Sequence, residues 1–316
     1  MSGPFLLAGN FRSRSGRELL GKVRNALEEL GAVTEVAVSR RPEELRRAVR
    51  TALTKGTRRV IAVGGDGTVG LVAGALVGRD ATLGIVPAGT GNDFARTMGI
   101  PMNTAEAARI AVRGSERAVD VGLVNGHPFV NAASVGLSAE VAHNVTAAQK
   151  AMLGPLAYPA TAARLLVSHR PLCVRLSGDA AFEGWSHQLV VANGHFQGGG
   201  TPTLPEADPE SGRLAAYLVE GRSRVTLFLV GLLVRFGRHT ELAPTVTFEG
   251  RRFLVETERP RRINADGEEI GRTPAEFSIR PRALRVLVPA DGLTPSPPAG
   301  VREGSPLAAL PRRPRP

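Results

Sequence analysis

Two glycine-rich segments carry carboxylate and hydroxyl side chains at a spacing that suits phosphate chemistry. Residues 64–68 read Gly-Gly-Asp-Gly-Thr, and residues 89–93 read Gly-Thr-Gly-Asn-Asp. Glycine lets a backbone approach a phosphate closely, so that amide N–H groups and hydroxyls can hold its oxygens. Neither segment has the Gly-Lys-Ser/Thr of a Walker loop or the G-x-G-x-x-G order of a dinucleotide site. The pair predicts a cradle for nucleotide phosphates, held by backbone, by the Thr68 and Thr90 hydroxyls and by magnesium.

Each segment taken alone has a plainer explanation. Gly, Asp and Asn are common in tight turns between a strand and a helix, and Asn92 or Asp93 could simply cap a helix. Two such segments after neighbouring strands are harder to explain as turns alone.

The first 120 residues alternate between strand and helix signals, and both glycine-rich segments directly follow a predicted strand. This order is typical of a parallel sheet with helices on both faces. Ligands bind beyond the carboxyl ends of such strands, so we expect both segments at one edge of the sheet. The apolar patterns predict strands at 5–8, 33–38, 59–63 and 82–86, and helices at 17–30, from 42 onward and after 68.

After about residue 120 the pattern changes to short β-rich runs separated by turn signals, which predicts a mostly antiparallel second domain. Two helical insertions interrupt it, near 145–168 and 222–236. The predicted β-runs are 119–124, 128–131, 172–176, 188–192, 214–219, 245–248, 253–256 and 277–279. We therefore expect a nucleotide-binding domain at 1–122, a β-rich acceptor-binding domain at 123–282, a strand at 283–290 that could return to the first domain, and a disordered Pro/Arg-rich tail at 291–316.

Composition limits the classes of protein. A chain of 316 residues, 42% of them hydrophobic, is long enough for two domains with sizeable cores. The single cysteine, Cys173, excludes an intramolecular disulfide and a cysteine metal cluster. The net charge of +11 favours a partner with phosphates, such as a nucleotide or an anionic membrane surface. The aromatic content of 4% offers little stacking surface, which argues against a nucleic-acid protein.

The chain lacks the sequence features of secretion and of membrane insertion. Its N-terminus has no basic region followed by an apolar core, and no apolar run approaches the roughly 18 residues of a spanning helix. We expect a cytoplasmic protein, with peripheral contact at the inner membrane face. The longest apolar run, 225–234, is flanked by arginines and could either lie on a membrane surface or form a buried helix of the second domain.

The ordered set of motifs resembles the diacylglycerol kinase catalytic-domain family, which includes bacterial lipid kinases and is related to sphingosine and ceramide kinases. The resemblance covers about residues 5–290 and implies an N-terminal parallel-sheet domain like that of NAD kinase and phosphofructokinase, followed by a β-rich, sandwich-like domain. Besides the two glycine-rich segments, the similar stretches are 10–17, 131–136 (Asn-Ala-Ala-Ser-Val-Gly), 156–158, 194–200 (Gly-His-Phe-Gln-Gly-Gly-Gly) and 264–268 (Asn-Ala-Asp-Gly-Glu).

The resemblance also implies roles for particular residues. Asp266 would be the general base that takes the proton from the acceptor hydroxyl, and Glu268 and Asp66 would be the carboxylates near magnesium. From the residues alone, Asp266-Gly267 also suits an ordinary hairpin turn. The implied ATP contacts are Ser39, Gly64, Gly65, Asp66, Gly67, Thr68, Val69, Gly70, Gly89, Thr90, Asn92 and Asp93.

The chain departs from the family pattern at several positions. Gly70-Leu71 stands where the family usually has an Asn-Glu pair, and Phe11 replaces a proline. The family's second metal site falls on residues 208–214, where an Asp-Gly has become Ser211-Gly212. Backbone carbonyls survive such a change, so Asp208, Ser211 and Arg213 are the candidate ligands there. A surface loop without an ion is the alternative.

We therefore predict an ATP- and magnesium-dependent kinase that phosphorylates a lipid hydroxyl, with diacylglycerol as the expected acceptor. The alternatives are a kinase of a soluble acceptor such as NAD, whose phosphate loop also contains Gly-Gly-Asp-Gly, and a non-catalytic lipid- or nucleotide-binding regulator. The residues 89–96 and the glycine loop 198–200 favour the lipid branch, and the intact Asp266 favours an enzyme.

Overall fold

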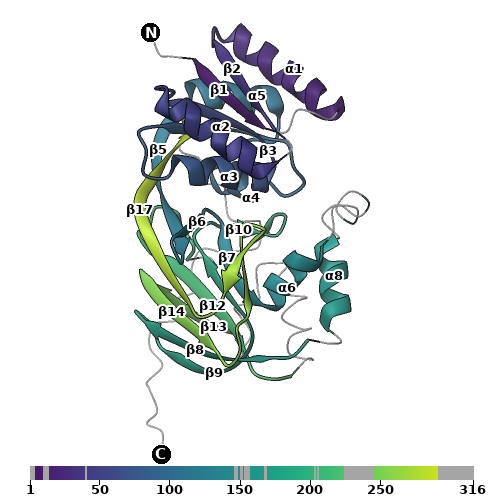
Figure 1. Ribbon diagram of the computed structural model, residues 1–316, viewed down its shortest axis with the longest axis vertical. Helices are drawn as coiled ribbons and strands as arrows, with labels where there is room; N and C mark the ends of the chain where they lie inside the picture. The colour runs from purple at the N-terminus through teal and green to yellow at the C-terminus, as the bar shows by residue number, and fades with distance from the viewer. Residues whose placement is uncertain are drawn as a thin grey trace, which may run out of the picture.

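The computed structural model describes residues 4–9, 14–39, 41–145, 149, 152, 157–166, 169–202, 204, 206–223 and 245–290. Within them the chain forms two domains stacked end to end and joined by one continuous sheet of 15 strands (Figure 1). Half of the opening motif (residues 10–13), nearly all of the predicted helix 222–236 and the tail 291–316 lie outside the described residues.

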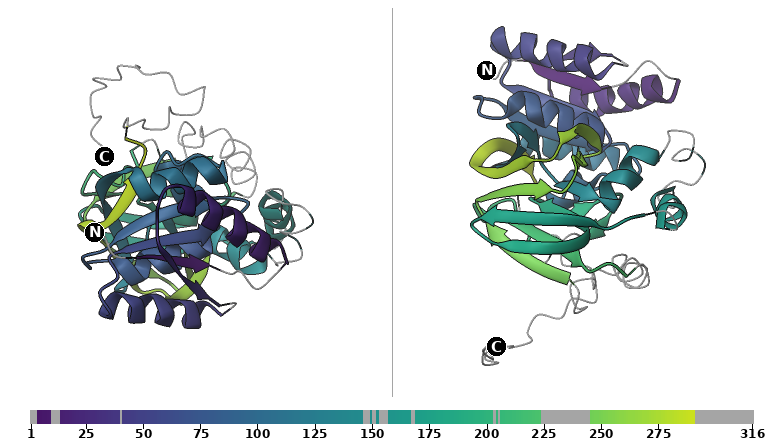
Figure 2. Two further views of the ribbon diagram at one scale, coloured as in Figure 1. Left: turned by 90° about the horizontal axis from the view of Figure 1, so that it is seen from above. Right: turned by 60° about the horizontal axis from the view of Figure 1, so that its bottom comes forward.

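The N-terminal domain is a parallel sheet with helices on both faces, as predicted. Its strands β1 (Phe5–Gly9), β2 (Thr34–Val38), β3 (Arg59–Gly64) and β4 (Thr82–Pro87) lie in the order β4-β3-β1-β2 and pair in parallel. Helices α1 (Arg14–Glu29) and α5 (Thr104–Arg113) contact each other, as do α2 (Pro42–Thr54) and α3 (Asp66–Leu76), and the strands lie between them (Figure 2). Every residue of β1 and β4 is buried, which is typical of parallel strands covered on both faces.

Two helices of this domain were not predicted. Helix α4 (Asp93–Thr97) has only five residues, too few for a periodic pattern. The buried face of α5 consists of Ile110 and three alanines, so few large apolar side chains mark it in the sequence. α4 begins at Asp93, the last residue of the second glycine-rich segment, and α5 follows it along the chain.

Two long strands connect the domains. β5 (Ser115–Val124) and β17 (Ala275–Val288) pair antiparallel along most of their lengths. β17 starts beside β14 (Arg252–Thr257) in the second domain and ends in parallel with β4 in the first. The register shifts between Arg280 and Leu284, where Arg282 takes a positive φ of 51°. Such a bulge bends a strand, and here it lies where the two domains meet.

The second domain is β-rich and mostly antiparallel, as predicted, with helices α6 (Leu137–Asn144) and α8 (Ala157–Leu166) beside it (Figure 1). Its core is built from buried apolar side chains such as Leu189, Phe253 and Phe277. The remaining strands are β6 (His127–Phe129), β7 (Ala132–Gly136), β8 (Leu172–Gly178), β9 (Phe182–Ala192), β10 (Phe196–Gln197), β11 (Thr201–Pro202), β12 (Leu214–Glu220), β13 (Thr245–Gly250), β15 (Arg262–Ala265) and β16 (Glu268–Arg272).

The prediction of a strand over 128–131 is wrong at its end. β6 stops at Phe129, and β7 begins only at Ala132. The amides of Val130 and Asn131 donate to the carboxylate of Asp266 and not to a neighbouring strand. The β15–β16 hairpin that carries Asp266 was not predicted as strands, because charged residues dominate β16.

The two glycine-rich segments touch backbone to backbone. Gly64 and Pro87 are paired at the ends of β3 and β4, so the segments after them leave the sheet side by side. A Cβ atom placed on Gly89 would lie 2.5 Å from the Cα atom of Gly65, and one on Gly65 would lie 3.0 Å from the Cα atom of Gly89. Only glycine fits at both positions, which explains this part of the sequence pattern.

Replacing Gly89 by alanine should therefore destabilise the fold. Because backbone must move to admit the methyl group, we expect Gly89→Ala to lower the free energy of unfolding by about 1–3 kcal/mol. Gly67→Ala is the matched control, since a Cβ on Gly67 meets nothing within 4 Å and Gly67 lies in α3. Urea unfolding should place the control within about 0.5 kcal/mol of wild type. Equal stability of the two variants would contradict the close approach.

Candidate active site

The implied nucleotide contacts gather at the carboxyl edge of the parallel strands. Ser39 follows β2, Gly64 ends β3, residues 66–70 form the start of α3, and Gly89 and Thr90 follow β4. Ser39 is buried; its hydroxyl donates to Glu44 Oε2 over 2.6 Å and accepts from the Arg41 amide over 3.0 Å. Thr68 and Thr90 both keep solvent access. The edge expected from the sequence is therefore the place where these segments meet.

Asp66 ties the first glycine-rich segment to the second. Its Oδ1 atom accepts from the amides of Asp93 over 2.6 Å and Phe94 over 3.3 Å, which are the first two residues of α4. A carboxylate from another loop thus caps this helix. Asn92 occupies the N-cap position of α4 with φ 54°, but its side chain makes no hydrogen bond to the helix. Its Oδ1 atom accepts from the Gly89 amide, and its Nδ2 atom donates to the Gly89 carbonyl.

Asp93 ties the same segment to the second domain. Its side chain is buried, and its two oxygens accept from the amides of Gly199 over 3.0 Å and Gly200 over 2.5 Å. A Cβ on Gly91 would lie 2.7 Å from Asp66 Oδ2 and 3.1 Å from the Cα atom of Gly199. Three sequence motifs that are distant along the chain therefore converge at one point between the domains.

Asp266 occupies a hairpin turn and reaches toward the nucleotide cradle. Asp266 and Gly267 join β15 to β16 with φ values of 48° and 90°, as in a two-residue hairpin loop. The carboxylate accepts from three consecutive amides: Oδ2 from Val130 over 2.6 Å, and Oδ1 from Asn131 over 2.9 Å and Ala132 over 3.2 Å. The turn explanation is correct, and the turn also fixes the direction of the carboxylate.

Gly70 borders the Asp266 carboxylate from the first domain. A Cβ on Gly70 would lie 3.7 Å from both Cβ and Oδ2 of Asp266. The usual asparagine of the family would therefore touch Asp266, whereas glycine leaves that side of the carboxylate uncovered. The contact also places the helix after the phosphate loop directly beside the predicted base.

Burial raises the pKa of all three aspartates, and the charge of Asp66 raises the pKa of the other two. Burial raises the pKa of Asp66, against the amide hydrogen bonds that lower it. Burial and the charge of Asp66 raise the pKa of Asp93 to about 6, although the Gly199 and Gly200 amides oppose the shift. Burial and, more weakly, the charge of Asp66 raise the pKa of Asp266 to about 6, while its three amide donors lower it. The negative charge of Asp66 therefore raises the pKa of an aspartate in each domain, Asp93 in the first and Asp266 in the second.

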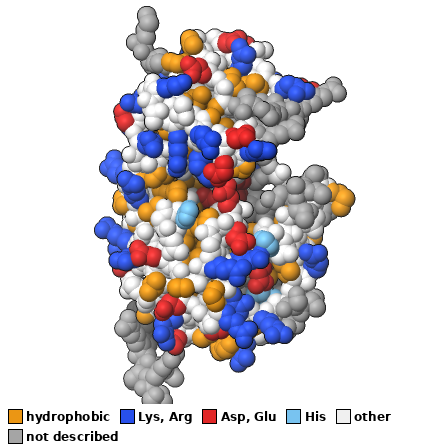
Figure 3. Space-filling model, in the orientation of Figure 1, with side chains coloured by type: hydrophobic (Ala, Val, Ile, Leu, Met, Phe, Trp, Pro, Cys, Tyr) orange, Lys and Arg blue, Asp and Glu red, His pale blue; other side chains and the backbone are white. Residues whose placement is uncertain are grey.

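Glu268 lies at the rim and bridges the domains. Its side chain is 49% exposed, and its Oε2 atom lies 3.8 Å from Arg46 Nη2 on α2. In Figure 3 acidic side chains gather at the level between the two domains, beneath a row of basic ones. The sequence analysis missed Arg46, because exposed arginines are frequent in this chain and nothing distinguishes it locally.

The candidate residues of the second metal site lie in one turn before β12. Asp208, Ser211 and Arg213 are brought together there, and their role as ion ligands stays a prediction. The sequence analysis missed Asp120, a buried residue of β5 whose carboxylate holds the Gly212 amide over 2.6 Å. A single acidic residue inside the apolar run 119–124 was the signal that could have found it.

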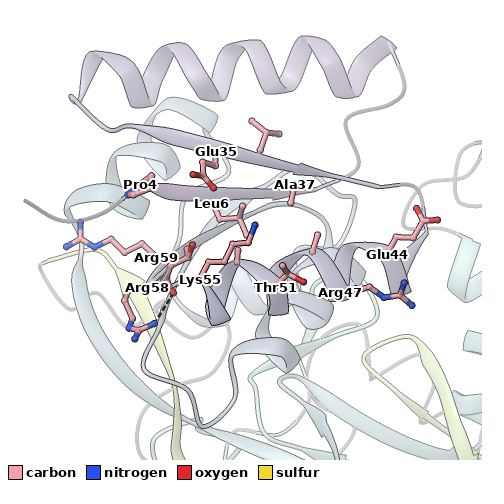
Figure 4. A pocket seen from close by; sticks show the side chains of 15 residues that line it. Pro4, Leu6, Glu35, Ala37, Glu44, Arg47, Thr51, Lys55, Arg58 and Arg59 are labelled. Carbon is pink, nitrogen blue, oxygen red and sulfur yellow. Dashed lines mark hydrogen bonds between the residues drawn. The ribbon is translucent and has the colours of Figure 1, made fainter.

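A cavity of about 910 Å³ lies elsewhere, between α2 and the strands β1 and β2 (Figure 4). Leu6, Ala37, Thr51 and Lys55 line it, and none of the predicted site residues does. It runs along the side of α2, so it is not the site formed by the motif segments.

Two negative results hold for the described part of the chain. There, no group of three or more His, Cys, Asp or Glu side chains could hold a metal ion by itself. None of the helices described is long and apolar enough to cross a membrane.

Comparison with known proteins decides the family. Residues 7–124 match the diacylglycerol kinase catalytic domain, and residues 131–288 match the YegS C-terminal NAD kinase beta sandwich-like domain. The chain is 30% identical over 289 residues to a diacylglycerol kinase of Bacillus subtilis (strain 168), an alignment that covers 89% of this chain and 95% of the relative. The chain belongs to the diacylglycerol kinase family of lipid kinases.

Other members of the diacylglycerol kinase family also align with this chain over most of its length. A protein described as a probable lipid kinase YegS-like from Pseudomonas aeruginosa (strain UCBPP-PA14) is 34% identical over 280 residues, covering 88% of this chain and 92% of the relative. The crystal structure of a diacylglycerol kinase from Bacillus anthracis has a TM-score of 0.70 at 20% identity and covers 90% and 96% of the two chains, which shows the shared fold. The predicted fold and the predicted family are both confirmed.

The raised pKa of Asp93 predicts how stability depends on pH. Because burial disfavours the ionised form, the folded state binds a proton at a higher pH than the unfolded chain. The contribution of Asp93 to the unfolding free energy should therefore grow as the pH falls from about 7 to 5, by about 1 kcal/mol. Asp93→Asn should lose this gain, as measured by urea unfolding at both pH values.

Asp80→Asn is the matched control. Hydrogen bonding and the charge of Arg285 lower the pKa of Asp80, so that it titrates below this window. The control should keep the wild-type difference between the two pH values. An unchanged difference in Asp93→Asn would contradict the raised pKa.

Proposed function

We propose that this chain is an ATP- and magnesium-dependent lipid kinase that transfers the γ-phosphoryl group to a hydroxyl of diacylglycerol, giving phosphatidic acid. The observation that carries the proposal is the position of Asp266. Its carboxylate comes from the second domain and borders Gly70, in the helix that follows the phosphate loop. A base and a phosphate cradle are thus adjacent, as phosphoryl transfer to a hydroxyl requires.

The first domain would bind the nucleotide. Residues 66–70 form the start of α3, and the N-terminus of this 11-residue helix would point toward the phosphates. Thr68 and Thr90 would add hydroxyl donors, and Ser39 at the end of β2 would lie farther along the same edge. Gly65 and Gly89 keep the two loops in contact, so the cradle has no side chain in its floor.

The carboxylates fit a magnesium ion that is shared with the phosphates. Asp66 Oδ2 faces the Gly91 and Gly199 backbone, and Asp266 and Glu268 lie on the other side of the cradle. These oxygens are the kind of ligand that magnesium takes together with substrate phosphates. The ion would neutralise charge that develops on the transferred group.

Asp266 suits the role of general base. With a pKa of about 6 it is mostly ionised near neutral pH and still basic enough to accept a proton. The lipid hydroxyl oxygen would attack the γ-phosphorus, the bond to ADP would break, and the hydroxyl proton would pass to the Asp266 carboxylate. The three amide donors from residues 130–132 keep the carboxylate oriented during this step.

The protein would work in peripheral contact with the inner face of the membrane. The net charge of +11 favours an anionic lipid surface, and the lipid kinases among the relatives support a lipid acceptor over a soluble one.

The decisive assay supplies γ-labelled ATP and magnesium with vesicles that contain diacylglycerol. Wild type should label the lipid, and Asp266→Asn should be slower by about 100-fold or more, because it cannot take the proton. The wild-type rate should also fall about tenfold for each pH unit below about 6.

Asp179→Asn is the control, since Asp179 also holds two backbone amides but lies in the β8–β9 turn. It should keep the wild-type rate within about twofold. Equal labelling by wild type and Asp266→Asn would remove Asp266 from the mechanism. Nucleotide binding without any labelled lipid would instead favour a soluble acceptor or a regulator.

A further inference from the structure

A serine hydroxyl closes the turn that leads into β12. Ser211 Oγ donates toward the carbonyl oxygens of Asp208 over 2.8 Å and Arg213 over 3.1 Å, and it accepts from the Arg213 amide over 3.2 Å. The Ser211 amide also donates to the Asp208 carbonyl over 3.1 Å. The Ser211 side chain therefore lies between two of the three residues that the family resemblance nominates as carbonyl ligands of a second cation, Asp208 and Arg213.

The distances between the Ser211 hydroxyl oxygen and the two carbonyl oxygens do not show whether the turn holds a cation, because oxygen ligands around one cation are spaced similarly. The charge of the oxygen groups is the feature that decides. The set offers two carbonyls and one hydroxyl, all neutral, in the place where the family has an aspartate. Divalent cations such as Mg²⁺ lose their water reluctantly and need carboxylates or phosphates in return. One oxygen of the nearby Asp208 carboxylate, Oδ1, is engaged within the turn, where it accepts from the Glu210 amide over 2.9 Å.

The turn is already anchored to the domain junction by Asp120. This residue of β5 is 1% exposed, and its amide donates to the Pro209 carbonyl over 2.7 Å. Its carboxylate accepts from Gly212 over 2.6 Å and from Arg282, at the bulge of β17, over 2.8 Å. Both ends of the turn are thus fixed by protein groups, and each oxygen of the buried carboxylate has an N–H donor.

Two ion pairs hold the outer side of the turn. Glu210 lies 3.3 Å from Arg117 on β5, and Arg213 lies 3.9 Å from Glu249 on β13. These contacts are partly exposed and contribute little each, but they connect the turn to neighbouring strands without an ion.

We propose that in this chain the Ser211 hydroxyl replaces the second cation, so that the 208–213 turn and its attachment to the domain junction do not depend on a divalent metal. The hydroxyl hydrogen presents the positive end of a dipole to the two carbonyl oxygens. A cation in that place would present a full positive charge. The magnesium requirement of the enzyme is then confined to the nucleotide.

The test is thermal unfolding of the full chain without nucleotide, in EDTA and with up to about 10 mM MgCl₂. Ser211→Ala should lower the midpoint in EDTA, since it removes the hydroxyl bonds to both carbonyls and leaves the Asp208 carbonyl only the Ser211 amide. Any magnesium-induced shift should be the same in wild type and Ser211→Ala. Ser211→Asp should gain a magnesium-dependent shift of roughly 2–4 °C, because it restores a carboxylate ligand.

Each outcome decides the proposal. A magnesium shift in wild type that Ser211→Ala abolishes would make Ser211 a cation ligand and overturn it. A folded Ser211→Asp without any added shift would show that the hydroxyl does not occupy an ion position. If Ser211→Asp does not fold, the comparison of wild type with Ser211→Ala decides alone. All of these readouts are independent of kinase activity.

Discussion

The Asp66 carboxylate accepts hydrogen bonds from the first two amides of α4, and the rest of the site depends on this contact. It fixes the second glycine-rich segment against the first. Asp93 then faces the second domain and takes the amides of Gly199 and Gly200. A carboxylate is suited to this task because it only accepts and can serve several donors at once. Backbone amides from three motifs are thereby collected around a few oxygens.

The same arrangement has an electrostatic cost that suits catalysis. Asp66, Asp93 and Asp266 are close enough that the charge of Asp66 raises the pKa of the other two. Amide donors reduce the penalty without removing it, which leaves carboxylates that are ionised at neutral pH but still basic. A cation bound there would relieve the repulsion between these carboxylates.

The local parts of this structure were predictable from the sequence, and the contacts between distant parts were not. The parallel strands and both glycine-rich turns follow from apolar periods and turn residues. Asp266 could be predicted as a turn residue, and the family resemblance made it the candidate base. Its three amide partners lie 134–136 residues away, and only the pairing of β15 with β7 brings them together. No local pattern specifies such a pairing.

Other features were missed for equally physical reasons. Helix α4 is too short to produce a period, and α5 buries mainly alanine. The strand predicted through Asn131 ends early because two of its amides serve the Asp266 carboxylate. Asp120 was overlooked as one polar residue in an apolar run, although burial of a carboxylate in a strand requires partners of this kind.

The central claim is that one carboxylate cluster spans the two domains, and a ¹³C NMR titration of the aspartate side chains tests it most directly. Wild type should show two carboxyls titrating near pH 6, of which Asp266→Asn removes one. Asp66→Asn, which keeps an oxygen acceptor for α4, should lower the pKa of both Asp93 and Asp266. Aspartates that all titrate near their ordinary value of about 4, or an Asp266 that ignores Asp66→Asn, would contradict the account.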